Sequence, residues 1–224
     1  MEKPADATMG DEAYIRDLAK KLHSLFVHRE DCYAVQTLVE YIRVKSLFTV
    51  DLVADHIRGK VTVGVYQVMP VVNTVKWMAF DFDIGKHEEV TEDRLRDQER
   101  QALDSYAHAS PKVKKASIVV FSGRRGYHFV TFFDPPAKAF RARELADGLA
   151  SSAKVSPSEI FPKQMSVSEG GYGNLLKLPL GIHRKTGKRC LLIDPTSRRE
   201  ISLEESLSFL NAVVPMKLPE LNFF

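Results

Sequence analysis

Apolar residues recur every three or four positions in the first quarter of the chain, as one buried face of a helix requires. This spacing predicts a helix over residues 11–27 and a second helix over residues 31–45. Thr49 is placed to cap a short third helix that ends before Gly59. The pattern therefore predicts an N-terminal helical subdomain over residues 1–58.

From residue 61 onward the pattern changes to the two-residue alternation that is typical of β-strands. Strands are predicted at 61–68, 76–83, 116–121 and 127–133, and shorter ones near 158–161, 174–178 and 190–194. Helices are predicted over 91–107, 136–152 and 203–211, the last opened by a capping box of Ser202 and Glu205.

Helices followed by a β-α-β-β-α-β series predict an α+β fold, with a mixed β-sheet that helices cover mainly on one side. The main body of this fold is predicted to span residues 59–215, and residues 216–224 form a C-terminal tail.

Composition places the chain among ordinary globular proteins. Its 224 residues are 44% hydrophobic and 27% charged, which excludes collagen-like, coiled-coil and intrinsically disordered classes. No apolar run approaches the roughly 18 residues of a membrane span, and the acidic start MEKPADATMGDE does not resemble a signal peptide. We therefore expect a cytoplasmic protein without a membrane partner. The two cysteines, Cys32 and Cys190, are too few for a cysteine-based zinc site.

The formal net charge of +3 is unremarkable, but the positive charge is clustered. Basic residues gather at 112–115, at Arg124 and Arg125, and at 184–189, whereas acidic residues concentrate in 88–104. One basic face that contacts phosphate and a solvated lysine-rich surface explain these clusters equally well.

Asp81 and Asp83 are two positions apart at the end of an apolar strand, so both carboxylates lie on the same face of that strand. Two carboxylates this close repel each other unless a cation lies between them, and their oxygen atoms suit Mg²⁺ or Mn²⁺. A polar strand end that runs into a loop is the alternative interpretation of so short a motif.

The segment FSGRRGYH at residues 121–128 places two arginines between two glycines in a tight turn between predicted strands. Glycine allows close backbone approach, and guanidinium groups match phosphate oxygens. Ser122 opens this turn and His128 follows it, where both can reach the same ligand. The alternative is an ordinary basic hairpin with a core histidine.

A second glycine-rich segment, GGYGNLLKLPLGIHRKTG at residues 170–187, leads into a short apolar strand that carries Lys177. A buried lysine in such a strand usually has an anionic partner, which here can be a triphosphate. His183 and further basic residues follow in the next turn. A lysine that snorkels to solvent from an edge strand is the alternative interpretation.

These three segments, in this order, resemble the signature of archaeo-eukaryotic primases and primase-polymerases. SGRRGYH is very similar to a motif of the small catalytic subunit of eukaryotic primase, and LLKLPLGIHRKTG resembles its triphosphate-binding segment. IFPKQ followed by GGYGNLLKLPLG is more similar still to primases of TOTE conflict systems and to CRISPR-associated primase-polymerases. The resemblance extends from about residue 25 to 210, and it implies a catalytic core with an RRM-like half and a second αβ unit.

The resemblance also implies a third metal-binding acid, and here the chain departs from the family pattern. Close relatives place an aspartate after the FPxQ string, where this chain has Met165. Glu159, just ahead of the string, is the favoured candidate, and Asp194 is the fallback. For Asp194, the start of the Pro195 turn is the better explanation. The cysteine cluster that TOTE primases often carry near the N-terminus is missing.

The implied function is template-directed nucleotidyl transfer, as a DNA primase, a primer-extending polymerase or both. Asp81, Asp83 and Glu159 would hold two ions of Mg²⁺ or Mn²⁺ about 3.5–4 Å apart, with His128 beside them. The NTP or dNTP would contact Ser122, Arg124, Arg125, His128, Lys177 and His183. A single-stranded DNA template would meet basic residues of 184–189 and 112–115, foremost Arg184, Lys185 and Lys188.

Two other functions remain open on the sequence alone. A two-metal nuclease also clusters acids, but it does not need basic turns suited to a triphosphate. A non-catalytic nucleic-acid-binding or nucleotide-binding domain with a degenerate site is supported by Met165 and opposed by the intact Asp81, Asp83 and His128. By family association alone, partners include CRISPR adaptation proteins, a helicase or other domains of a longer chain.

Overall fold

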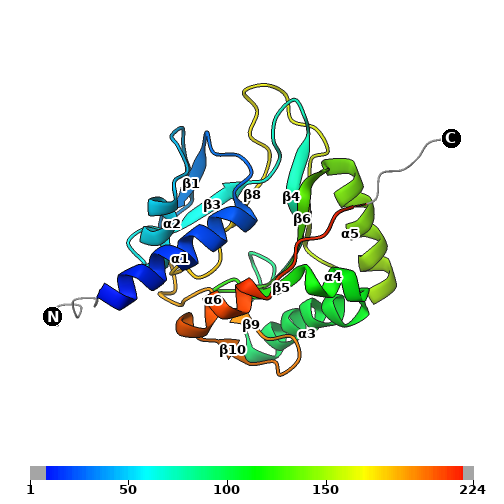
Figure 1. Cartoon of the computed structure of the whole chain (residues 1–224). Helices are drawn as coiled ribbons and strands as arrows, with labels where there is room; N and C mark the ends of the chain where they lie inside the picture. Colours follow the sequence, from blue (N-terminus) through cyan, green and yellow to red (C-terminus); the bar gives the residue numbers. More distant parts are fainter. Residues whose placement is uncertain (1–8, 219–224) are drawn as a thin grey trace.

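A computed structural model describes residues 9–218, which form two β-sheets with helices packed around them (Figure 1). Residues 1–8 of the predicted N-terminal subdomain and residues 219–224 of the predicted tail lie outside the described residues. No helix in the described part of the chain is long and apolar enough to cross a membrane.

The smaller sheet has four strands in the order β2-β1-β3-β8, and all its neighbours pair antiparallel. Its strands are β1 (Tyr33–Gln36), β2 (Tyr41–Val44), β3 (Val63–Tyr66) and β8 (Leu175–Lys177). The helices α1 (Met9–Phe26) and α2 (Val50–Ile57) share one hydrophobic core with this sheet, through residues such as Leu18, Val63 and Leu176. Thr49 caps α2 as predicted, because its side chain accepts a hydrogen bond from the Leu52 amide at 3.2 Å.

The larger sheet has six strands in the order β10-β9-β5-β6-β4-β7, and all its neighbouring strands also pair antiparallel. Its strands are β4 (Thr74–Asp83), β5 (Ser117–Phe121), β6 (Gly126–Lys138), β7 (Glu159–Phe161), β9 (Leu192–Ile193) and β10 (Glu200–Ile201). The α+β class is therefore confirmed, but the sheets are antiparallel rather than mixed.

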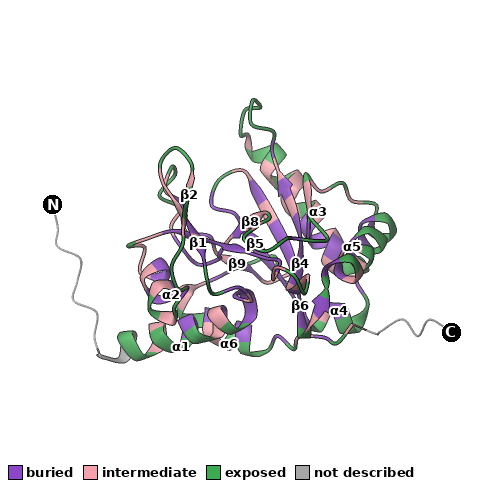
Figure 2. Ribbon diagram, turned by 90° about the horizontal axis from the view of Figure 1, so that it is seen from above, coloured by how far each residue is buried: buried purple, intermediate pink, exposed green. Residues whose placement is uncertain are grey.

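Helices cover both faces of the larger sheet (Figure 2). Strand β4 alternates between the two layers, so that Trp77 and Ala79 join the core shared with α1, whereas Phe80 and Phe82 join the other core. The first layer also contains α6 (Leu203–Asn211), and the second contains α3 (Glu92–His108), α4 (Pro111–Lys115) and α5 (Ala139–Ala153). The expectation of helices mainly on one side is therefore wrong.

The predicted helix over residues 31–45 is also wrong, because this segment forms the β1–β2 hairpin. The tight turn at its tip is closed by Thr37, whose hydroxyl accepts hydrogen bonds from the amides of Val39 and Glu40. Strand β1 also pairs with β3, so the predicted N-terminal helical subdomain is not wholly helical and shares a sheet with the predicted core. The capping box of Ser202 and Glu205 at α6 is confirmed.

Candidate active site

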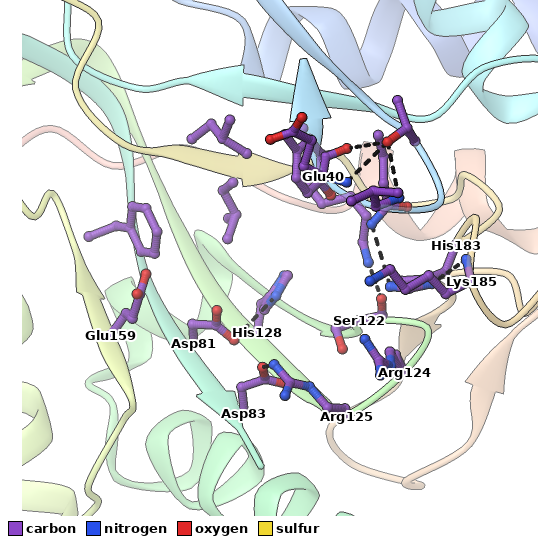
Figure 3. A pocket seen from close by; sticks show the side chains of 18 residues that line it. Glu40, Asp81, Asp83, Ser122, Arg124, Arg125, His128, Glu159, His183 and Lys185 are labelled. Atoms are coloured by element: carbon purple, nitrogen blue, oxygen red, sulfur yellow. Dashed lines mark hydrogen bonds and ion pairs between the residues drawn. The ribbon is translucent and has the colours of Figure 1, made fainter. Parts of the chain in front are cut away.

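A cleft between the two sheets collects most of the residues that the sequence singles out (Figure 3). Strand β4 and the β5–β6 turn contribute from the larger sheet, and β8 and the turn after it contribute from the other side. The predicted residues that line this cleft are Asp81, Asp83, Ser122, Arg124, Arg125, His128, Glu159, Lys177, His183 and Lys185. Residues from four separate stretches of the chain thus meet at one place.

The two aspartates lie on the face of β4 that points into the cleft, as the two-residue spacing predicts. Strand register places Asp81 directly opposite His128 on β6 and opposite Glu159 on β7. The Nε2 atom of His128 lies 3.4 Å from Oδ1 of Asp81. Gly126 pairs with Asp83, and any side chain at position 126 would collide with the backbone of β4. This glycine is therefore required for the turn to approach the carboxylates.

Burial changes the acid–base behaviour of this cluster. Burial, reinforced by the negative charge of Glu159, raises the pKa of Asp81 to about 7. Burial and the neighbouring Asp81 also raise the pKa of Asp83, although Arg125 opposes this by donating a hydrogen bond to Asp83 Oδ2. Burial lowers the pKa of His128 to about 3, so the imidazole is neutral at pH 7. The positive charge near Asp81 and Asp83 is therefore not sufficient to stabilise both carboxylates in their ionised form.

The donor set fits a divalent cation. Mg²⁺ is usually held by one or two carboxylates together with water and substrate phosphates, so Asp81 and Asp83 suffice as protein ligands. Glu159 lies in register beside Asp81, but its carboxylate pairs with Lys163 at 2.8 Å. Within residues 9–218, no three His, Cys, Asp or Glu side chains converge as a metal-binding group. Glu159 as third ligand stays a prediction.

The fallback acid, Asp194, is not among the residues that line the cleft. Its carboxylate accepts hydrogen bonds from the Thr196 amide and the Ser197 hydroxyl, both at 2.8 Å. These hydrogen bonds hold the pKa of Asp194 below its ordinary value. Asp194 therefore stabilises the turn after β9, the alternative explanation of this residue.

Two interlocked turns form the basic side of the cleft. Gly123 has a φ of +84°, and a side chain there would meet His183 in the facing turn, so glycine is needed on both counts. The Thr186 hydroxyl donates a hydrogen bond to the Gly123 carbonyl at 2.7 Å, which joins the two turns directly. Arg124 is exposed at this junction, where Figure 3 shows it beside Lys185 and His183.

Lys177 projects from β8 toward the carboxylate side, and its ammonium group donates a hydrogen bond to the Ser122 carbonyl. Burial lowers the pKa of Lys177. His183 has a pKa lowered to about 4, by burial first and then by Lys177 and Arg124. The cleft thus places a row of carboxylates opposite a set of cations and neutral imidazoles, an arrangement suited to a ligand that carries both a metal ion and phosphates.

The β1–β2 hairpin supplies a third wall that sequence reasoning missed. Its residues in the cleft are Gln36, Thr37, Val39, Glu40 and Tyr41. Gln36 fixes the basic turn, because its Oε1 accepts from the Arg184 amide at 3.1 Å and its Nε2 lies 3.4 Å from Nε2 of His183. A period-two pattern at Tyr33, Val35 and Thr37 was the signal available for this strand.

The predicted template contacts are only partly brought to the cleft. Lys185 lines it, whereas Arg184 and Lys188 do not. The basic residues 112–115 lie on α4, whose apolar residues pack against the face of the larger sheet opposite the cleft. The structure therefore separates this cluster from the candidate site.

The cleft between the two sheets thus places carboxylates opposite cations. Comparison with protein-family models matches residues 41–223 to the archaeo-eukaryotic primase domain of TOTE conflict systems. The match covers most of the chain, which therefore belongs to this primase family. It includes the β2 strand, both aspartates and both basic turns. A search of curated proteins finds no match.

Two solved structures are similar to the chain at low identity. One is the archaeo-eukaryotic primase domain of the primase-polymerase of cyanophage S-2L, with 14% identity, a TM-score of 0.49, and coverage of 87% of this chain and 97% of that chain. The other is the polymerase domain of ligase D from Mycobacterium tuberculosis in complex with DNA, with 13% identity, a TM-score of 0.45, and coverage of 89% and 87%.

Proposed function

We propose that the chain is a template-directed nucleotidyltransferase, acting as a DNA primase, a primer-extending polymerase or both on single-stranded DNA. The observation that carries the proposal is the meeting of Asp81 and Asp83 with Arg124, Lys177 and His183 in one cleft. A nucleoside triphosphate with its metal ion brings both signs of charge, and this cleft offers a complement to each. Membership in a primase family supports the same function.

Mg²⁺ or Mn²⁺ held by Asp81 and Asp83, with Glu159 as the proposed third ligand of a two-ion site, would lower the pKa of the attacking 3′-hydroxyl and neutralise the leaving pyrophosphate. The protein groups have separate tasks. Lys177 and Arg124 neutralise and orient the triphosphate from the side opposite the carboxylates. The amide groups and the hydroxyl of the Ser122 turn add hydrogen bonds to phosphate oxygens.

Arg125 and His128 link the two halves of the cleft. Arg125 pairs with Asp83, so once another cation neutralises that carboxylate its guanidinium can turn to a phosphate oxygen. His128 is neutral at pH 7 and carries one N–H, which it can donate either to Asp81 or to the ligand. Both residues therefore interact with the carboxylates in the absence of ligand, and both can contact a phosphate group when a nucleotide is bound.

The test is synthesis on single-stranded circular DNA with labelled nucleotides and either Mg²⁺ or Mn²⁺, with and without an annealed primer. Asp83→Asn removes the charge with little change of shape and is expected to abolish labelled products. Asp93→Asn on α3, where the side chain is 92% exposed, is the matched control and should retain full activity. Products that persist in Asp83→Asn would refute the proposal. Products without primer identify a primase, and products only with primer identify an extending polymerase.

One observation favours a second candidate, a non-catalytic domain that binds nucleic acid or nucleotide. Met165 is 55% exposed where relatives place an aspartate, and the described residues include no three-ligand metal group. This candidate predicts nucleotide binding without any synthesis in either metal. If the rest of the site is intact, Met165→Asp restores the family residue and is then expected to create activity.

A further inference from the structure

A cluster of aromatic and basic side chains covers the face of the smaller sheet that points toward the cleft. Its members are Arg43 on β2, Lys45 just after β2, Tyr66 on β3, and Tyr172 in the segment before β8. We call these four residues the ledge. None of them is in the set of residues that line the cleft, so the ledge is a separate surface beside it.

Three cations surround the ring of Tyr172. The guanidinium carbon of Arg43 lies 4.0 Å from the ring centroid, that of Arg29 lies 4.9 Å away, and the ammonium of Lys45 lies 5.8 Å away. The ring of Tyr66 packs against Tyr172 with centroids 5.6 Å apart. Cation–π contacts of this kind hold a guanidinium group in a defined place at the surface.

The three cations differ in how their charge is compensated. Arg29 is buried, forms hydrogen bonds through two nitrogens to Asp31, and donates another to the Gly171 carbonyl. The side chains of Arg43 and Lys45 are exposed, and within residues 9–218 neither side chain forms a hydrogen bond or ion pair with the protein. Arg29 therefore has a structural role, whereas two converging positive charges are left for an external anion.

The ledge is continuous with the cleft. Tyr41 precedes Arg43 by two positions on β2, so both side chains lie on the same face of that strand. Tyr41 and Leu175 line the cleft, and both also pack in the small cluster that contains Tyr66 and Tyr172. A ligand that leaves the cleft past Tyr41 therefore meets the ledge directly.

We infer that the ledge binds single-stranded nucleic acid, with backbone phosphates on Arg43 and Lys45 and one base stacked on the guanidinium plane that Tyr172 supports. Unpaired bases stack on aromatic rings and on arginine planes, whereas the bases of a duplex are not accessible to such a surface. The inference rests on the proposed function, because it makes this strand the template. It assigns template binding to residues other than Arg184, Lys185 and Lys188.

The experiment measures the affinity of a fluorescein-labelled 20-nucleotide oligothymidylate by anisotropy over a range of salt concentrations. Arg43→Gln with Lys45→Gln is expected to weaken binding about tenfold and to reduce the slope of log affinity against log salt by about 1.4, since each phosphate contact on a single strand contributes about 0.7. The matched control, Lys112→Gln with Lys115→Gln, removes the same charge from α4 on the opposite face and should bind like the wild type.

Tyr172 is tested as a positioning residue. Tyr172→Leu removes the ring and is expected to weaken binding, whereas Tyr172→Phe keeps the ring and should restore it. Fluorescence of Trp77 during thermal unfolding verifies that each variant is folded. Parallel arms with oligouridylate and with a duplex of equal length distinguish DNA from RNA and single from double strands.

The inference would be overturned if the ledge variants bound the oligonucleotide as tightly as the wild type. It would also be overturned if the double variant on α4 weakened binding as much as the double variant in the ledge, or if the duplex bound as tightly as the single strand. Its failure is distinct from failure of the proposed function. If the wild type synthesises nothing but the ledge variants still lose the oligonucleotide, the ledge stands and the catalytic proposal falls. If synthesis on a primed template proceeds and the ledge variants bind normally, the catalytic proposal stands and the ledge falls.

Discussion

Replacing Asp81 by Asn should make the protein more stable, by an amount that grows with pH. In the folded protein the pKa of Asp81 is about 7, mainly because the carboxyl group is buried, against an ordinary value of 3.8. A raised pKa means that the folded state holds the proton more tightly than the unfolded state. Asp81 therefore costs the folded state nothing below pH 3.8, where both states are protonated, and progressively more between 3.8 and 7, where only the unfolded state ionises. Above pH 7 both states are ionised and the cost is constant.

The magnitude follows from this difference. One pKa unit corresponds to about 1.36 kcal/mol, so Asp81 destabilises the fold by about 4 kcal/mol above pH 7, where both states are ionised. At pH 5 it destabilises the fold by about 1.6 kcal/mol, because the folded state keeps the proton that the unfolded state releases. Asn resembles the protonated carboxyl group in shape and cannot ionise. The free energy of unfolding of Asp81→Asn should therefore exceed that of the wild type by about 2.5 kcal/mol more at pH 8.5 than at pH 5.

Urea unfolding in metal-free buffer, followed by the fluorescence of the fully buried Trp77, measures this difference directly. The chain has one tryptophan, so the signal reports β4 itself. Asp93→Asn should show no pH-dependent difference from the wild type. Adding Mg²⁺ should stabilise the wild type and not Asp81→Asn, because only the native carboxylate binds the ion. A variant less stable than the wild type at pH 8.5, or a difference that is the same at both pH values, would refute the reasoning.

Three further outcomes are expected. Lys177→Met keeps the aliphatic stem, removes the ammonium group, and should lower kcat/KM for nucleotide addition by an amount equivalent to about 2–4 kcal/mol, with a melting temperature near that of the wild type. Gly126→Ala places a methyl group against the backbone of β4 and should lower the melting temperature sharply, whereas Gly148→Ala, in the open on α5, should raise it or leave it unchanged. Ser202→Ala breaks the capping box of α6 and should cost about 1 kcal/mol in urea unfolding, an effect absent in Ser152→Ala.

Local rules account for much of the fold. Strand periodicity correctly places Asp81 and Asp83 on one face, and the pair of glycines around Arg124 and Arg125 correctly predicts a turn between two paired strands. The capping box at Ser202 needs only four consecutive residues, and it forms as expected. Each of these features depends on residues only a few positions apart in the sequence, which is the range over which a sequence pattern is informative.

Features that depend on contacts between residues far apart in the sequence cannot be predicted from local patterns. The prediction of a helix at the β1–β2 hairpin is wrong because the apolar residues there fit helical spacing as well as strand spacing. Only pairing with β3 selects the strand. The register that places Glu159 beside Asp81 joins strands that are far apart in sequence, as does the packing of Tyr172 between Arg43 and Tyr66. No local signal distinguishes these pairings from their alternatives.

Burial opposes the ionised form of a key group on each side of the cleft. Burial raises the pKa of Asp81 and lowers the pKa of Lys177, so burial disfavours the ionised form of each group when no ligand is bound. On the proposed function, a metal ion would favour the ionised carboxylates, and a triphosphate would favour the protonated lysine. Because these two ligands also bind each other, each would improve the site for the other, and linkage requires the effect to be reciprocal. On the proposed function, joint binding of metal and nucleotide would offset part of the stability that Asp81 costs the unliganded protein.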